Sequence, residues 1–166
     1  MLNQKIFDIL FNFGNKHKKI TVFTTIYSCY LFFIMYLIGY IHIFLNFYKY
    51  NYKGVLKYVF IPLITIIIAK IIRKKINSKR PFEKMNITSL VKHKGGGSLP
   101  SNHSTSAMVL AISLTYIAPK YFIIYIILAL ITGVSRIMSG LHYPIDVLSG
   151  FILGFTTGFL GFYILF

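Results

Sequence analysis

Acidic residues are almost absent from this chain. Three carboxylates, Asp8, Glu83 and Asp146, stand against 18 lysines and arginines, which gives a formal net charge of +15 at pH 7. A two-metal hydrolase surrounds its ions with several carboxylates or histidines, so three scattered carboxylates exclude that kind of centre, and the sequence predicts no metal and no cofactor. Cysteine is nearly absent too. The single Cys29 excludes an internal disulfide.

Polar sequence is scarce as well, since 56% of the residues are hydrophobic and the mean hydropathy is +0.69. In a soluble protein the excess of positive charge would indicate nucleic-acid binding. Here the apolar runs are too long for a small soluble domain, so the expected partners are the lipid bilayer and anionic lipid or phosphate, and no nucleic acid is expected. The length of 166 residues predicts one domain, 1–166.

Five apolar segments follow an amphipathic stretch. Residues 1–19 alternate apolar and polar side chains and end in four basic or histidine residues, a pattern typical of a helix on a membrane surface. The first apolar segment exceeds a signal-peptide core and lacks a small-residue cleavage site, so it is interpreted as a retained anchor. Each segment is near the ~17–25 residues that cross a bilayer as a helix. The predicted spans are 20–46, 54–72, 103–118, 121–139 and 145–166.

The predicted fold class is therefore all-α: an integral membrane helical bundle of about five transmembrane helices plus an N-terminal amphipathic segment. Five crossings bring the end of the second span, the start of the third, the end of the fourth and the start of the fifth to one face. The polar clusters at those four points are Arg80-Pro81, Pro100-Ser101-Asn102-His103, Ser135-Arg136 and His142–Asp146. The sequence thus predicts one shared site at one membrane surface.

Each cluster alone has an ordinary explanation. If Pro144 opens a helix, His142 and Asp146 lie about one turn apart, which fits an ion pair at a helix start as well as an activated histidine. Ser101 or Asn102 is a good helix N-cap, and Arg80 is a basic residue near a membrane end. Together, however, guanidinium groups, a helix N-terminus and two histidines make a receptor for a tetrahedral oxyanion.

These clusters resemble the signature of the type-2 phosphatidic acid phosphatase family. That signature has three parts: Lys, six residues, Arg-Pro; then Pro-Ser-Gly-His; then Ser-Arg, five residues, His, three residues, Asp. The matching residues are Arg73 with Arg80-Pro81, Pro100-Ser101-Asn102-His103, and Ser135-Arg136 with His142 and Asp146, so the motifs bracket residues 73–146. Two departures stand out. Arg73 replaces Lys, with Lys74 as a possible substitute, and Asn102 replaces Gly.

The resemblance implies a metal-independent lipid phosphate phosphatase. In this family-based assignment His142 attacks phosphorus and becomes a phosphohistidine, Asp146 orients it, and His103 protonates the leaving oxygen and then activates water. The phosphoryl oxygens are held by Arg73, Arg80, Ser101, the amide of Asn102, and Arg136. The non-catalytic alternative, a channel, transporter or lipid-binding protein, leaves the two histidines and Asp146 unexplained. Vanadate-dependent haloperoxidases share the motifs but are larger and soluble.

The substrate and the orientation are expected from the resemblance. Undecaprenyl diphosphate ranks first, and phosphatidylglycerophosphate, phosphatidate and lipid A phosphate follow. Counting basic residues by the positive-inside rule places the site in the cytoplasm. Several of those charges, however, are expected to bind phosphate. The resemblance favours a multi-pass protein of the cell membrane with an extracytoplasmic site, and that orientation is the one we predict.

Overall fold

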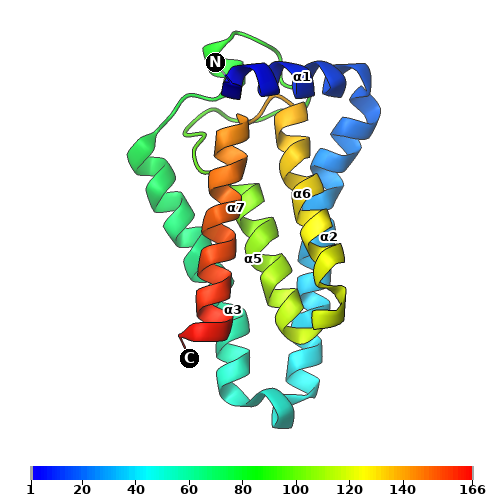
Figure 1. Cartoon of the computed structure of the whole chain (residues 1–166), viewed down its shortest axis with the longest axis vertical. Helices are drawn as coiled ribbons and strands as arrows, with labels where there is room; N and C mark the ends of the chain where they lie inside the picture. Colours follow the sequence, from blue (N-terminus) through cyan, green and yellow to red (C-terminus); the bar gives the residue numbers. More distant parts are fainter. Residues whose placement is uncertain (1, 166) are drawn as a thin grey trace.

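The computed structural model describes residues 2–165, and these form helices and connecting loops without a β-strand. The all-α prediction is confirmed. The elements are α1 (Leu2–Lys16), α2 (Lys18–Leu45), α3 (Phe47–Ile76), α4 (Pro81–Lys84), α5 (Asn102–Ile117), the short turn η1 (Pro119–Tyr121), α6 (Phe122–Met138), α7 (Pro144–Phe159) and the π-helical turn η2 (Leu160–Ile164). Five long helices, α2, α3, α5, α6 and α7, run side by side as a bundle (Figure 1).

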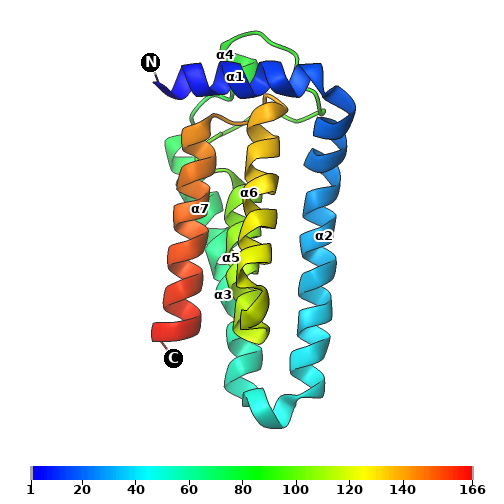
Figure 2. The same cartoon turned by 45° about the vertical axis from the view of Figure 1, so that its right-hand side comes forward.

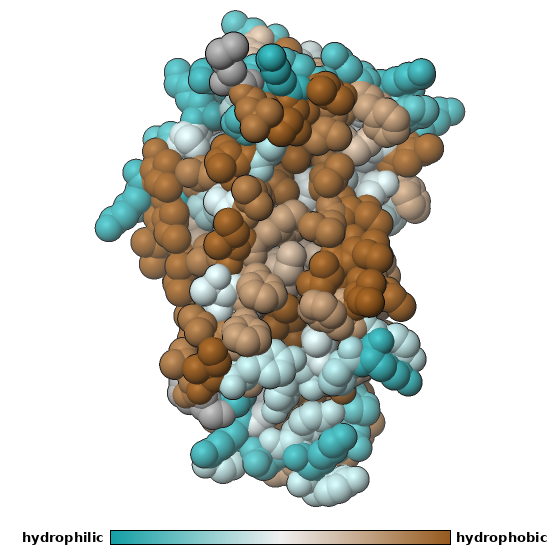
Figure 3. All heavy atoms as spheres, viewed as in Figure 1, coloured by the Kyte–Doolittle hydropathy of each residue, from teal (hydrophilic) through white to brown (hydrophobic). Residues whose placement is uncertain are grey.

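The bundle carries a broad apolar belt between two polar ends (Figure 3). Within residues 2–165, four segments are long and apolar enough to cross a membrane: Lys18–Leu45, Phe47–Lys84, Pro119–Met138 and Pro144–Ile164. The remaining predicted span, 103–118, corresponds to α5, which has only 16 residues. At 1.5 Å per residue it is about 24 Å long, less than the ~30 Å of a hydrocarbon core.

Helix α5 lies at the centre of the bundle, and its first residue lies inside the bundle rather than at the end of the bundle. Figure 1 shows α5 beginning further inside than the points where α6 ends and α7 begins, so the loop before it descends between the helices. Three glycines one turn apart, Gly150, Gly154 and Gly158, let α7 pack closely on α5. A Cβ at Gly154 would lie 2.5 Å from the carbonyl oxygen of Thr105.

The amphipathic helix α1 lies across the end of the bundle at which α6 stops and α7 starts (Figure 2). Phe7 is fully buried against Ile137, Tyr143 and Val147, and Gly14 packs directly on the backbone of Met138. The predicted amphipathic segment is confirmed, with one refinement. Its buried face packs on protein, and hydrophobic residues of its other face, such as Ile9, remain exposed to the surroundings.

Candidate active site

The four predicted polar segments meet beneath α1, at one end of the bundle. Backbone hydrogen bonds join them: Ser101 N–H donates to the Asp146 carbonyl at 2.9 Å, and Ser98 N–H donates to the Ser78 carbonyl at 2.8 Å. Arg80 Nη1 donates to the Leu141 carbonyl at 3.1 Å. The sequence-based prediction of a shared site at one face is consistent with this arrangement.

His142 lies at the centre of the junction, in the loop between α6 and α7, and only 1% of it is exposed. Arg80 Nη1 lies 3.1 Å from His142 Nε2. Since a guanidinium can only donate, Nε2 accepts and the ring hydrogen resides on Nδ1. Burial lowers the pKa of His142, and the charges of Arg80 and Arg73 lower it further against the raising effect of Asp146. The ring is therefore neutral at pH 7, with the Nε2 lone pair available.

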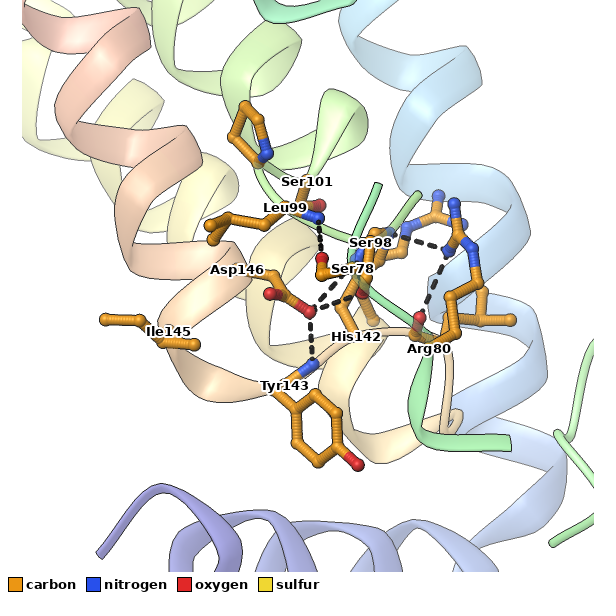
Figure 4. Close-up of polar contacts among 12 residues, drawn as sticks. Ser78, Arg80, Ser98, Leu99, Ser101, His142, Tyr143, Ile145 and Asp146 are labelled. Atoms are coloured by element: carbon orange, nitrogen blue, oxygen red, sulfur yellow. Dashed lines mark hydrogen bonds and ion pairs between the residues drawn. The ribbon is translucent and has the colours of Figure 1, made fainter. Parts of the chain in front are cut away.

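Asp146 lies behind the other ring nitrogen, in the first turn of α7. Pro144 opens that helix, and Asp146 at its third position caps it, because Oδ2 accepts from the Tyr143 N–H at 2.8 Å. The distance from Oδ2 to His142 Nδ1 is 3.6 Å. The hydroxyl of Ser98 lies between the two groups, 2.5 Å from Oδ2 and 3.2 Å from Nδ1 (Figure 4). Sequence reasoning missed Ser98, whose only signal is a small polar residue two positions before the second motif.

Arg80 is locked in place by the triglycine loop. Its Nε and Nη2 donate to the carbonyls of Gly96 and Gly97 at 3.1 and 3.3 Å, and the residue is 1% exposed. Glu83 closes the loop by accepting from the N–H groups of Arg80 and Gly96 at 2.9 and 3.2 Å. A side chain at Gly95 would collide with Glu83, because a Cβ there would lie 2.2 Å from Oε1. The glycines thus allow the loop to approach the charged residues closely.

Arg73 occupies the first basic position. Its Nε and Nη2 donate to the Pro100 carbonyl at 3.3 and 3.1 Å, and its side chain is half-buried, whereas Lys74 is exposed. Ser101 is the N-cap of α5, as predicted, with its hydroxyl oxygen 3.4 Å from the Ser104 N–H. The adjacent Asn102 begins the helix and supplies one of its first free amides.

Arg136 and His103 face a different neighbour, helix α2. Arg136 Nη2 donates to the Thr25 carbonyl at 2.6 Å and contacts Cys29 Sγ, while its buried Nε has no partner among the described residues. His103 lines a cavity of about 60 Å³ with Cys29 and Thr132. Thr25 and Cys29 were missed by sequence reasoning, because nothing in an apolar span marks two small residues as neighbours of a distant arginine.

A larger cavity of about 690 Å³ lies on the other side of Asp146. Lys79 and Lys84 line it together with Asn3 and Gln4 of α1. Two lysines and two amides make this space suited to an anion at the headgroup level. Among residues 2–165, no three histidine, cysteine or acidic side chains lie close enough together to hold a metal ion.

The fold and this junction define a class of protein: a helical membrane protein with a buried, arginine-bound histidine at one end of its bundle. A family model described as the PAP2 superfamily matches residues 54–166. The chain belongs to the PAP2 superfamily.

Among curated proteins, the chain is similar to undecaprenyl-diphosphatase BcrC of Bacillus subtilis, with 37% identity over 83 residues, 50% of this chain and 43% of that protein. It is also similar to an undecaprenyl-diphosphatase of Sulfolobus acidocaldarius, with 33% identity over 100 residues, 59% of this chain and 48% of that protein. The matched segments thus span less than half the length of these relatives. Among solved structures, LpxE of Aquifex aeolicus matches 97% of this chain and 94% of its own, with a TM-score of 0.77 and 21% identity, which supports the fold alone.

Proposed function

We propose that this chain hydrolyses a phosphate ester or diphosphate on a membrane lipid through a phosphohistidine at His142. One observation carries the proposal: the Nε2 lone pair of a buried, neutral histidine faces a guanidinium, Arg80, at 3.1 Å. An incoming phosphoryl oxygen can replace Nε2 as the acceptor of the Arg80 hydrogen bond. The same guanidinium then binds the phosphate, and Nε2 is left free to attack phosphorus.

The remaining residues have roles that their positions support. Arg73 and Arg136 flank the junction and add positive charge for the phosphoryl oxygens, together with the Ser101 hydroxyl and the Asn102 amide at the start of α5. In the first step the bond from Nε2 to phosphorus forms and the bond to the leaving oxygen breaks, with a proton supplied by His103. In the second step His103 removes a proton from water, which attacks phosphorus and releases phosphate and His142.

The proposed substrate is undecaprenyl diphosphate, ranked ahead of phosphatidylglycerophosphate and phosphatidate. Two relatives carry the name undecaprenyl-diphosphatase. A site at the end of an apolar bundle suits a phosphate at the headgroup level of a bilayer. The lysine-lined cavity beside Asp146 adds positive charge where a polyanionic headgroup would approach.

The test of this function is an assay of the purified, full chain against a panel of these lipid phosphates in detergent or vesicles. We expect phosphate release that the His142→Ala variant abolishes, and release that persists when a chelator is added. His93→Ala is the matched control, because His93 is an exposed loop histidine that should leave turnover unchanged. A His142→Ala variant with wild-type turnover would favour the non-catalytic alternative. Activity lost to a chelator and restored by a metal ion would contradict the metal-free mechanism.

The proposed location is the cell membrane, with the site on the extracytoplasmic side. Two exposed lysines allow a direct test: Lys92 in the loop between α4 and α5, and Lys49 in the first turn of α3. Figure 1 shows that loop near α1 and the start of α3 at the opposite end of the bundle. In intact cells a membrane-impermeant maleimide should label the Lys92→Cys variant and leave Lys49→Cys unlabelled. The wild-type chain, with its single Cys29, gives the background. The reverse pattern would place the site in the cytoplasm.

A further inference from the structure

A serine outside all three motifs separates the candidate nucleophile from its carboxylate. Ser98 is fully buried, and its Oγ lies 2.5 Å from Asp146 Oδ2 and 3.2 Å from His142 Nδ1 (Figure 4). The direct distance from Nδ1 to Oδ2 is 3.6 Å. Hydrogen bonds of this type rarely exceed about 3.2 Å. The histidine and the carboxylate therefore interact through the hydroxyl.

The positions of the hydrogens follow from Arg80. A guanidinium has no acceptor, so the 3.1 Å contact with His142 Nε2 requires the lone pair to be there and the hydrogen to be on Nδ1. That hydrogen is donated to Ser98 Oγ. Because the hydroxyl accepts on this side, its own hydrogen points to the Asp146 carboxylate, which cannot donate when ionised. The three groups have one consistent arrangement: Nδ1–H to Oγ, and Oγ–H to Oδ2.

Backbone hydrogen bonds to Ser78 fix the position of Ser98. Its N–H donates to the Ser78 carbonyl at 2.8 Å, and the next N–H, of Leu99, donates to the Ser78 hydroxyl at 3.1 Å. Ser78 itself lies just after α3. The hydroxyl between His142 and Asp146 is thus fixed by a third part of the chain, so that the ring orientation depends on the loop before α5 as well as on α7.

We propose that Ser98 is a positioning residue for His142 in the phosphatase reaction, an inference that rests on the proposed function. It accepts the Nδ1 hydrogen of the tautomer that Arg80 selects, and so fixes the orientation of the ring whose Nε2 attacks phosphorus. When the bond from Nε2 to phosphorus forms, the ring becomes cationic, and Ser98 transmits the charge of Asp146 to the Nδ1–H. When water later breaks that bond, the electron pair returns to Nε2. The hydrogens on Nδ1 and Oγ stay in place throughout, so Ser98 neither gains nor loses a proton in the reaction.

The test compares Ser98→Ala and Ser98→Thr with Ser89→Ala. Ser89 lies in the same loop, and among residues 2–165 its hydroxyl bonds only to the Val91 carbonyl, at 2.9 Å, so its replacement is a matched control. We expect Ser98→Ala to lower kcat roughly 10–100-fold, with little change in KM. Losses of this size are common when the hydrogen-bond partner that orients a functional histidine is removed. Ser98→Thr, which keeps a hydroxyl, should recover part of the loss. Ser89→Ala should resemble the wild type.

A second readout needs no substrate. NMR of the labelled histidine ring, assigned with the His142→Gln variant, should show hydrogen on Nδ1 in the wild type and in Ser98→Ala, because Arg80 selects that tautomer in both. The Nδ1–H proton resonance should move upfield in Ser98→Ala, because its hydrogen bond to Oγ is lost. Wild-type kcat in Ser98→Ala, or an unchanged Nδ1–H proton resonance in that variant, would overturn the role of Ser98. Retained turnover in His142→Gln would instead overturn the proposed function, so the two failures are distinguishable.

Discussion

Arg136 of α6 reaches across the bundle and donates a hydrogen bond to the backbone carbonyl of Thr25 in α2, at 2.6 Å. The guanidinium also contacts Cys29 Sγ, and its Nε remains free of protein partners among the described residues. One part of the group is therefore held by α2, while another part can still bind an anion. This relationship makes α2, which carries none of the three motifs, a component of the candidate site.

Replacing Arg136 should show this dual role. We expect Arg136→Ala to lower kcat by roughly 10²–10³, the usual cost of removing a donor that stabilises developing charge. Arg136→Lys should recover only part of the activity, because an ammonium lacks the fork that contacts the Thr25 carbonyl and a phosphate together. Steady-state kinetics measure both. Cys29→Ala is the control, since it leaves the carbonyl contact intact, and a loss equal to that of Arg136→Ala would show that the thiol is the essential contact.

The first basic position can be assigned by variants of its two candidates. Arg73 contacts the Pro100 carbonyl from a half-buried position, whereas Lys74 is exposed. Arg73→Ala should therefore reduce kcat/KM by at least about tenfold, the effect of losing about 1.4 kcal/mol of transition-state binding, and Lys74→Ala should leave it near the wild-type value. Arg73→Lys, which restores the common residue of the family, should be the mildest change at this position. Equal losses for the two alanine variants would contradict the assignment.

The pH dependence should reflect the environment of His142. Burial lowers its pKa, so the ring stays neutral and nucleophilic below the ordinary value of about 6.5. The acid limb of kcat/KM that belongs to His142 should accordingly lie below that value. The same shift affects stability, because the unfolded chain takes up this proton first as the pH falls. The contribution of His142 to the free energy of unfolding is therefore fully present above about pH 6.5 and decreases as the pH falls below that value.

An NMR titration of the His142 ring, assigned with His142→Gln, separates this limb from titration of the substrate phosphate. A ring that becomes protonated above pH 6.5 would show that the attraction of Asp146 outweighs burial and the neighbouring arginines.

The contact between α5 and α7 should be sensitive to small increases in volume. Gly154→Ala puts a Cβ 2.5 Å from the Thr105 carbonyl oxygen, so the helices must separate, at a cost of about 1–3 kcal/mol of stability. Gly158→Ala is the milder control, because its nearest neighbours are side-chain atoms of Ile112 at 3.1 Å. Thermal unfolding in detergent measures the difference. A Gly154→Ala variant as stable as the wild type would mean that this helix pair is not tightly packed.

The helical architecture could be predicted from the sequence because each span is a long apolar run with polar ends. The predicted span 20–46 corresponds to α2 at Lys18–Leu45, and 103–118 corresponds to α5 at Asn102–Ile117. Each crossing takes the chain to the other side, so ends separated by an even number of crossings lie on the same side. That reasoning needs no side-chain detail, and for this reason it could predict that distant segments share a site.

The finer structure of the site depends on contacts that no periodicity encodes. Ser98 lies in a polar loop with no repeating pattern, and its importance comes from the path that the loop takes down to the start of α5. Cys29 becomes a neighbour of Arg136 only through the way α2 packs against α6. The amphipathic pattern of residues 1–19 was likewise correct, but the pattern alone could not show that Phe7 packs on protein.

The shortness of α5 has a consequence for how a lipid could be processed. Because α5 begins further inside the bundle than the adjoining ends of α6 and α7, the phosphate of the proposed lipid substrate must move inward from the headgroup level to reach Ser101 and His103. The attacking water has to make the same descent. The loop before α5 brings buried polar groups, Arg80 among them, to this junction. In the proposed reaction the lipid phosphate therefore exchanges hydration for hydrogen bonds with the protein, while the tail of the lipid remains in the bilayer.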